Sequence, residues 1–297
     1  VDLNGKKETH KILEPENHDL IFSIAKRAPI LWALEKLAWV EGYAVKSIMI
    51  LAKLAEIPIE DSLQNKPIES LKKILGSWNP QTSLNLQKRI ECLNKIFMDF
   101  PETIGLELCI DQLSSRFSIE NTYPEWRTLS LKVPEDGHSA AIDRLKFVNK
   151  IFRLLISKSS QSFIILRRLL LNFDNLLISH KVQVLESAHK WLLSNKNSFE
   201  EIGKIANLFR YHVDPEDTIS LQHTKFNSLR STLISELNQG PIAHTNRWLF
   251  DNNYVPMPNE FVGNQDEWNQ ELYTLRIDTV SKILKNDNIE GLLKFVR

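Results

Sequence analysis

Apolar residues recur along nearly the whole chain at spacings of three and four, which is the period of an amphipathic helix. The clearest stripes are Leu86, Ile90, Leu93 and Phe97; Leu145, Val148, Phe152 and Leu155; Phe199, Ile202, Ala206 and Phe209; Phe226, Leu229, Leu233 and Leu237; and Trp268, Leu272 and Leu275. The first stripe predicts a helix that begins near Thr82. About a dozen such segments follow one another, with almost no alternating pattern of the kind that marks a strand.

Helix ends are marked by residues that helices tolerate poorly. Gly42 is expected to separate two N-terminal helices, and Pro58, Pro101 and Pro241 fall between stripes. The chain is therefore predicted to be all-α, either a degenerate HEAT/armadillo-like α-solenoid or a set of stacked helical hairpins with about a dozen helices. Neither the tetratricopeptide nor the ankyrin consensus pattern occurs in it.

Two stretches interrupt the helical pattern. Residues 113–139 and 251–265 are rich in proline and loop-forming residues, and the first is long for a connection inside a compact domain. We place a soft boundary there, between an N-terminal helical lobe (1–130) and a C-terminal helical lobe (131–297). One continuous solenoid is the alternative. Both ends of the sequence lie within helical patterns or close to them, which is expected of a segment of a larger protein.

Composition narrows the class of protein further. Only 9 of the 297 residues are glycine, which suits long helices, and 37 basic residues balance 37 acidic ones. No overall charge therefore favours nucleic acid or an anionic membrane, and no window approaches the ~20 apolar residues that span a bilayer. Cys92 and Cys109 are expected to be small buried side chains in a reducing, cytoplasmic setting, with a disulfide as the alternative.

Motifs for catalysis and cofactors are missing or incomplete. Gly5-Lys6 has no upstream glycine at Walker spacing and is followed by Lys7, and Ser139 in a Gly-His-Ser-Ala-Ala stretch is better explained as a helix N-cap than as a nucleophile. The eight histidines are scattered. We therefore predict no catalytic, cofactor-binding or metal-ligating residue. The alternative is an enzyme whose site is assembled from His138, Glu135 and Asp136 beside loop 113–139.

One charge pattern departs from an ordinary surface. From Arg144 to Phe173 the chain contains no acid, and its basic residues are Arg144, Lys146, Lys150, Arg153, Lys158, Arg167 and Arg168. Helical geometry places the cations of Lys146, Lys150 and Arg153 on one face, opposite the Leu145 stripe. This face is either neutralised by acids elsewhere in the fold, such as Glu186 or Glu200, or binds a protein partner, or binds nucleic acid. The neutral total charge and the lack of interleaved aromatic residues disfavour nucleic acid.

The seven tryptophans divide into two groups. Trp32, Trp39, Trp191 and Trp268 fall on apolar stripes and are predicted to be core residues. Trp78 and Trp126 lie in or beside loops, where each either pins the loop or serves as an exposed binding anchor. The candidate partner-binding residues are therefore Lys146, Lys150, Arg153, Arg167, Arg168, Trp126 and Trp78.

Several short blocks, together spanning roughly residues 28–285, resemble a known class of helical repeats. They are LWALE (31–35), AKLAEI (52–57), NKP (65–67), WNPQT (78–82), Arg89, PETIG (101–105) and RWLFD (247–251). The series is similar to the helical-repeat region of large, mostly uncharacterised bacterial proteins, namely STAND-type NTPases and sirtuin-bearing proteins of antiphage defence. The resemblance implies a non-catalytic segment that senses a ligand, scaffolds neighbouring domains or mediates assembly with a protein partner. Any enzymatic domain would then lie elsewhere in the parent chain.

Overall fold

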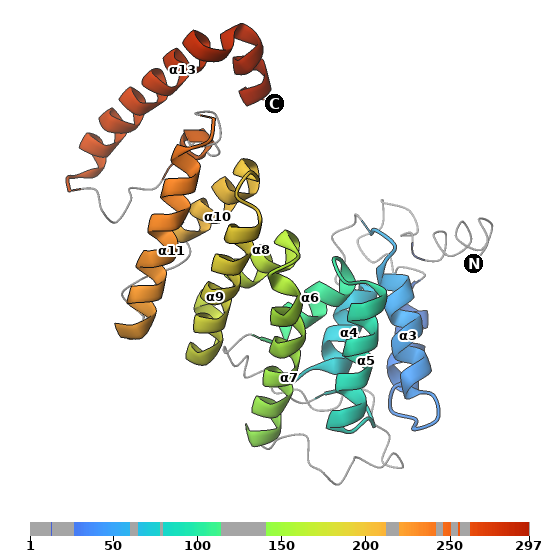
Figure 1. Cartoon of the computed structure of the whole chain (residues 1–297). Helices are drawn as coiled ribbons and strands as arrows, with labels where there is room; N and C mark the ends of the chain where they lie inside the picture. The colour runs from blue at the N-terminus through green and yellow to red at the C-terminus, as the bar shows by residue number, and fades with distance from the viewer. Residues whose placement is uncertain are drawn as a thin grey trace. The chain divides into compact units, whose positions relative to one another are not determined.

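The computed structural model of the chain describes residue 13 and residues 27–59, 65–77, 80–113, 141–211, 220–241, 246–250, 255 and 262–296. Within these residues all regular structure is helical, comprising eleven α-helices and two short 3₁₀ helices (Figure 1). The prediction of an all-α protein with about a dozen helices is thereby confirmed. Across the same part of the chain, no helix is both long and apolar enough to span a bilayer.

The chain divides into two compact units, Val1–Leu155 and Ile156–Arg297. The first contains α2 (Arg27–Leu37), α3 (Ala44–Ala55), α4 (Pro67–Leu75), α5 (Leu86–Asp99), α6 (Ile104–Asp111) and most of α7 (Ala141–Ser159). The second contains the end of α7, α8 (Phe163–Leu171), η1 (Phe173–Asn175), α9 (Ile178–Ser194), α10 (Phe199–Tyr211), α11 (Ser220–Asn238), η2 (Arg247–Leu249) and α13 (Gln265–Val296). The boundary predicted near residue 130 lies outside the described residues.

In the first unit, α3 packs against α2 and α4, and α5 packs against α6. The contact between α5 and α6 depends on Gly105, because a Cβ atom there would lie 2.5 Å from the Cα of Phe97 and 2.6 Å from the carbonyl oxygen of Phe100. Only hydrogen fits at that distance. Gly105 therefore allows the two helix backbones to approach each other more closely than any other residue would.

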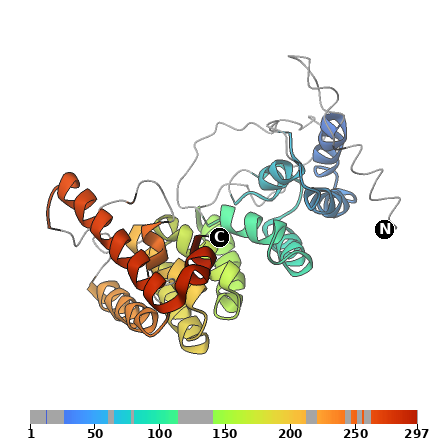
Figure 2. The same cartoon turned by 90° about the horizontal axis from the view of Figure 1, so that it is seen from above.

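In the second unit, α11 contacts both α9 and α10, and α8 also contacts both of these helices (Figures 1 and 2). The predicted stripes on α10 and α11 are buried, including Ile202, Phe209, Phe226 and Leu229. The rings of Phe209 and Phe226 lie 5.3 Å apart and join the two helices. Local periodicity was sufficient to identify these core faces.

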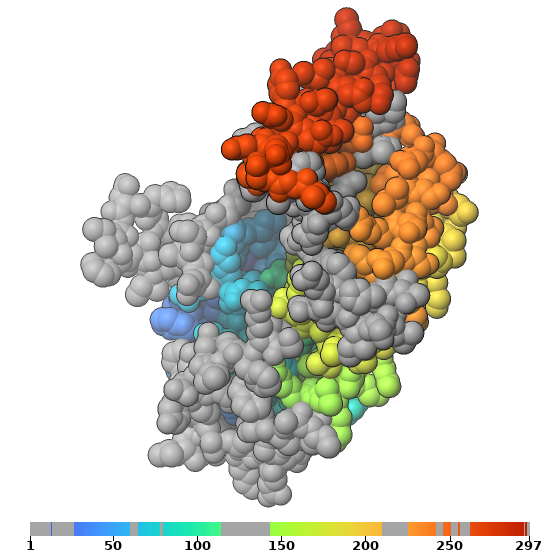
Figure 3. All heavy atoms as spheres, turned by 90° about the vertical axis from the view of Figure 1, so that its left-hand side faces the viewer, coloured from blue at the N-terminus to red at the C-terminus, as the bar shows by residue number. Residues whose placement is uncertain are grey.

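The long helix α13 is anchored through one face only. Trp268 and Leu272 pack against Leu249 and Val255, and the indole nitrogen of Trp268 donates a hydrogen bond to the Val255 carbonyl at 3.0 Å. Much of the rest of α13 lies at the surface, as Figure 3 shows. The helix is kinked at Asn288, which has a φ of 59°.

The structure corrects two predictions about helix faces and ends. Leu145 was expected to be buried but is 48% exposed, because α7 instead turns Phe147 and Ile151 toward the core. The helix expected to begin near Thr82 begins at Leu86, capped by the Asn85 side chain. Thr82 lies in the preceding loop, where its hydroxyl donates to the Ala38 carbonyl at 2.7 Å.

The core predictions for aromatic and cysteine residues are mostly confirmed. Trp39, Trp191 and Trp268 are buried. Trp32 is 39% exposed, so its assignment to the core was wrong; it lies at the edge of the face that α2 buries. Cys92 and Cys109 are buried free thiols, and burial raises their pKa values to about 11 and about 12 respectively, which keeps both protonated.

Replacing Gly105 by alanine should destabilise the chain by about 3 kcal/mol, because the new methyl group overlaps backbone atoms that cannot move aside easily. Gly42 provides the control. It has open space where a Cβ would lie, so Gly42→Ala should be neutral or stabilise by about 0.5 kcal/mol. Urea denaturation of both variants measures the difference. Equal stability of the two variants would refute the close-approach argument.

A buried histidine predicts how stability depends on pH in the second unit. His180 on α9 is 3% exposed, and burial lowers its pKa from 6.5 to about 4. The folded state therefore holds a neutral imidazole that the unfolded state protonates more readily. The free energy of unfolding is therefore unaffected by His180 above pH 6.5. It falls by up to about 3 kcal/mol as the pH decreases toward 4, because protonation of His180 favours the unfolded state.

Unfolding free energies measured between pH 7.5 and 4 should fall less steeply in a His180→Gln variant than in the unchanged chain. His189→Gln, which alters a half-buried histidine on the same helix, is the matched control and should leave the slope nearly unchanged. A slope that His180→Gln does not alter would contradict this assignment.

Candidate functional site

The basic residues predicted on α7 lie together on its exposed face. Phe147, Val148, Ile151, Phe152 and Leu155 form the buried face of the helix. The side chains of Lys146, Lys150 and Arg153 are exposed on the opposite face. We call these three residues the α7 basic face. A helix that buries one apolar face in the first unit necessarily turns the residues opposite toward solvent.

Among the described residues, one carboxylate forms an ion pair with this face. The ammonium nitrogen of Lys146 lies 3.1 Å from Oδ1 of Asp143, one turn earlier on the same helix. Lys150 and Arg153 make no ion pair with any carboxylate of the described residues. Such i,i+3 and i,i+4 cations repel one another by a few tenths of a kcal/mol. Two of the three cations are thus available to an external anion.

The two acids that the sequence suggested as partners of the basic segment form ion pairs with other lysines. Glu186 forms an ion pair with Lys225, and the carboxylate of Glu200 lies 2.6 Å from the ammonium group of Lys204 on its own helix. Pairing of Glu186 or Glu200 with the α7 basic face is therefore not what the structure shows. Within the part of the chain that the structure describes, Asp143 is the one carboxylate paired with this face.

The two arginines predicted on the next helix differ from each other. Arg167 on α8 is exposed, whereas Arg168 is half-buried. Adjacent residues on a helix point about 100° apart, so the two guanidinium groups do not share one face of α8. Neither makes an ion pair with a carboxylate of the described residues.

A buried arginine contacts the apolar face of α7. Arg89 on α5 is 5% exposed; its guanidinium donates to the Gly76 carbonyl at 2.5 Å and lies 5.2 Å from the centre of the Phe147 ring. Burial lowers its pKa to about 10, and the negative charge of Asp143 partly opposes that shift. The Phe147 ring thus contributes a cation–π contact on the buried face of α7, opposite the basic residues.

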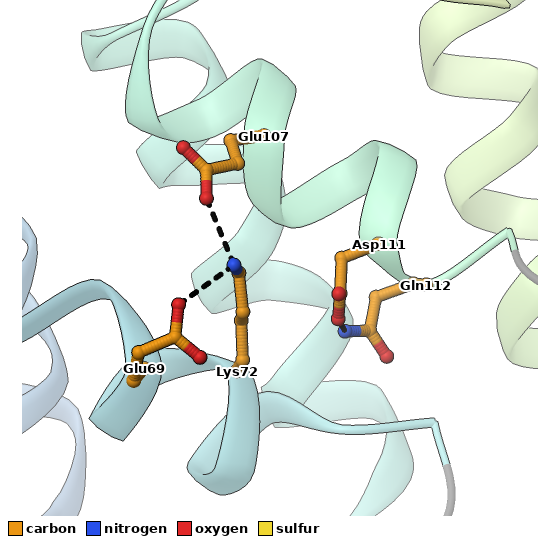
Figure 4. Close-up of polar contacts among 5 residues, drawn as sticks. All are labelled: Glu69, Lys72, Glu107, Asp111 and Gln112. Carbon is orange, nitrogen blue, oxygen red and sulfur yellow. Dashed lines mark hydrogen bonds and ion pairs between the residues drawn. The ribbon is translucent and has the colours of Figure 1, made fainter. Parts of the chain in front are cut away.

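The structure also reveals a polar cluster that the sequence did not indicate (Figure 4). The ammonium group of Lys72 on α4 lies 2.9 Å from Glu69 on the same helix and 2.8 Å from Glu107 on α6. Burial lowers the pKa of Lys72, but the hydrogen bonds to Glu107 and Glu69 outweigh that effect, so the pKa is raised. We call this arrangement the Lys72 clamp, since it joins α4 to α6.

Beside the clamp, Asp111 and Gln112 continue the polar contacts. The amide of Gln112 donates to Asp111 at 2.9 Å and accepts from the Ser77 backbone N–H at 2.6 Å. Burial raises the pKa of Asp111. The positive charge of Lys72 opposes this rise, whereas the negative charges of Glu69 and Glu107 add to it. The sequence shows Glu69 and Lys72 at i,i+3 spacing on one helix. Glu107, the second partner of Lys72, lies on α6, which does not follow α4 directly in the chain.

The remaining predicted residues lie outside the described part of the chain. These are Trp78, Trp126, the proposed N-cap Ser139, most of loops 113–139 and 251–265, and the residues His138, Glu135 and Asp136 of the enzymatic alternative. In the described residues, no group of three or more histidine, cysteine, aspartate or glutamate side chains is arranged to hold a metal ion.

Comparison with known proteins gave no match: no family model fits the chain, and no curated protein or solved structure is significantly similar to it. Its function must therefore be argued from its own residues.

Replacing Lys72 by methionine should destabilise the chain by about 1 kcal/mol, because it leaves Glu69 and Glu107 close together without their cation. Lys95→Met removes a more exposed lysine with a single partner, Asp99, and should cost only about 0.3 kcal/mol. Both losses should shrink in 1 M NaCl, where charges are screened within about 3 Å. Urea denaturation that ranks the two variants the other way would show that Lys72 is not a clamp.

Proposed function

We propose that this chain is a non-catalytic helical interaction segment that binds a protein partner through the α7 basic face. The observation that carries the proposal is that Lys150 and Arg153 have no carboxylate partner among the described residues, while the candidate acids Glu186 and Glu200 are paired with other lysines. Exposed like charges without internal partners favour an external anion. Acidic side chains of a partner protein supply such charges at low cost in desolvation.

The architecture supports a scaffold or sensor role. Helix α8 pairs with α9 and α10 pairs with α11, and the two pairs contact each other through α8 and α10 and through α9 and α11, as expected of stacked helical hairpins. The resemblance to the helical-repeat regions of STAND-type NTPases and sirtuin-bearing defence proteins favours the same role, with effector chemistry elsewhere in a parent chain. Two buried, protonated thiols suit a reducing, cytoplasmic setting. Nucleic acid is the less favoured ligand, because the overall charge is balanced.

Affinity capture from the native host, with and without phage challenge, should recover a specific protein that is lost in a Lys150→Glu/Arg153→Glu variant. The charge reversal acts through the face itself, because both side chains are exposed and their replacement leaves the core intact. Mass spectrometry of the captured material is the measurement.

The control variant is Lys46→Glu/Lys190→Glu, which makes the same change in net charge at exposed helical lysines on α3 and α9. It should retain the captured protein. Loss of that protein from both variants, or from neither, would contradict binding through the α7 basic face.

A further inference from the structure

The spacing of the α7 basic face matches a second helix. Lys146, Lys150 and Arg153 are separated by four and then three residues, which places them within about 10 Å along the helix axis. A helix packed at about 20° to α7 keeps side chains of the same 4-3 spacing in register over that length. An extended peptide, whose side chains alternate every two residues, would not.

The charge of the face selects an acidic partner. Lys150 and Arg153 meet no carboxylate of the described residues, and Lys146 meets only Asp143 of its own helix. Glutamates at 4-3 spacing on a partner helix would bring one carboxylate to each cation. This arrangement also removes the repulsion among the three cations, so the charges of the two surfaces are complementary.

The margin of the face adds an apolar contact. Leu145 is 48% exposed and lies about 100° around the helix from Lys146. On the other margin, Leu154 is half-buried. A band of cations flanked by leucine can bind an apolar side chain as well as carboxylates. Nucleic acid and simple polyanions have charge but no aliphatic side chain for Leu145 to contact.

We infer that the α7 basic face binds an amphipathic acidic helix. Glutamates of that helix form ion pairs with Lys146, Lys150 and Arg153, and one of its aliphatic side chains packs against Leu145. The inference rests on the proposed function, and it specifies the chemistry of the partner.

The probe is a synthetic helical peptide with three glutamates at 4-3 spacing and one leucine flanking them, and a second peptide has serine in place of that leucine. Fluorescence anisotropy with the full chain measures both affinities. Lys150→Ala/Arg153→Ala should weaken both peptides at least tenfold, and rising NaCl should do the same. Leu145→Ser should weaken the leucine peptide about five- to tenfold and leave the serine peptide unchanged.

Ile164→Ser is the matched control, since Ile164 is a 44% exposed aliphatic residue on α8 and its loss should change neither affinity. If Leu145→Ser has no effect while the charge variant weakens both peptides, the apolar contact is refuted and the proposed function stands. No measurable binding of the leucine peptide at about 1 mM also overturns the inference. If single-stranded RNA binds more tightly than either peptide and depends on the same cations, both the inference and the proposed function fail.

Discussion

One buried cation contacts the apolar face of α7 and links it to two earlier helices. Arg89 joins the end of α4 to α5 and to α7, because its guanidinium donates to Gly76 and lies against the ring of Phe147. A buried guanidinium without a direct carboxylate partner is costly, and its lowered pKa records that cost. Phe147 stacks on Arg89 from the same face of α7 that buries Val148, Ile151, Phe152 and Leu155, and the basic face lies opposite. The proposed binding surface thus follows from a packing constraint on the opposite side of the same helix.

Two further contacts between helices stabilise the first unit. The Lys72 clamp joins α4 to α6, and Gly105 lets α5 and α6 approach closely where a side chain would prevent it. The clamp joins helices that are not consecutive in the chain, and Gly105 sets the approach of two consecutive helices, so together they define the arrangement of helices that are individually short. A rigid helical frame of this kind suits a protein that presents a fixed surface, because a preorganised surface loses less entropy on binding.

The sequence was sufficient where structure is local. The stripes on α10, α11 and α13 identified buried faces correctly, because burial of one helix face leaves a 3.6-residue period in the sequence. The sequence was insufficient where a residue's environment comes from another helix. Leu145 is exposed because α7 buries Phe147 and Ile151 instead, and the pairing of Lys72 depends on Glu107 of α6. The cations of the α7 basic face were identified from periodicity and charge. The sequence could not show that Glu186 and Glu200 pair with other lysines, nor that Lys150 and Arg153 have no carboxylate partner among the described residues.

The most direct test of this account is a charge-swap experiment with the captured partner. Lys150→Glu/Arg153→Glu in this chain should abolish binding, and reversal of the contacting glutamates of the partner to lysine should restore it, because the attraction depends on the pairing of opposite charges. Restored affinity, measured by isothermal titration calorimetry, would show that these cations meet acidic side chains directly. If the doubly reversed pair binds no better than either singly reversed pair, the α7 basic face is not the binding surface.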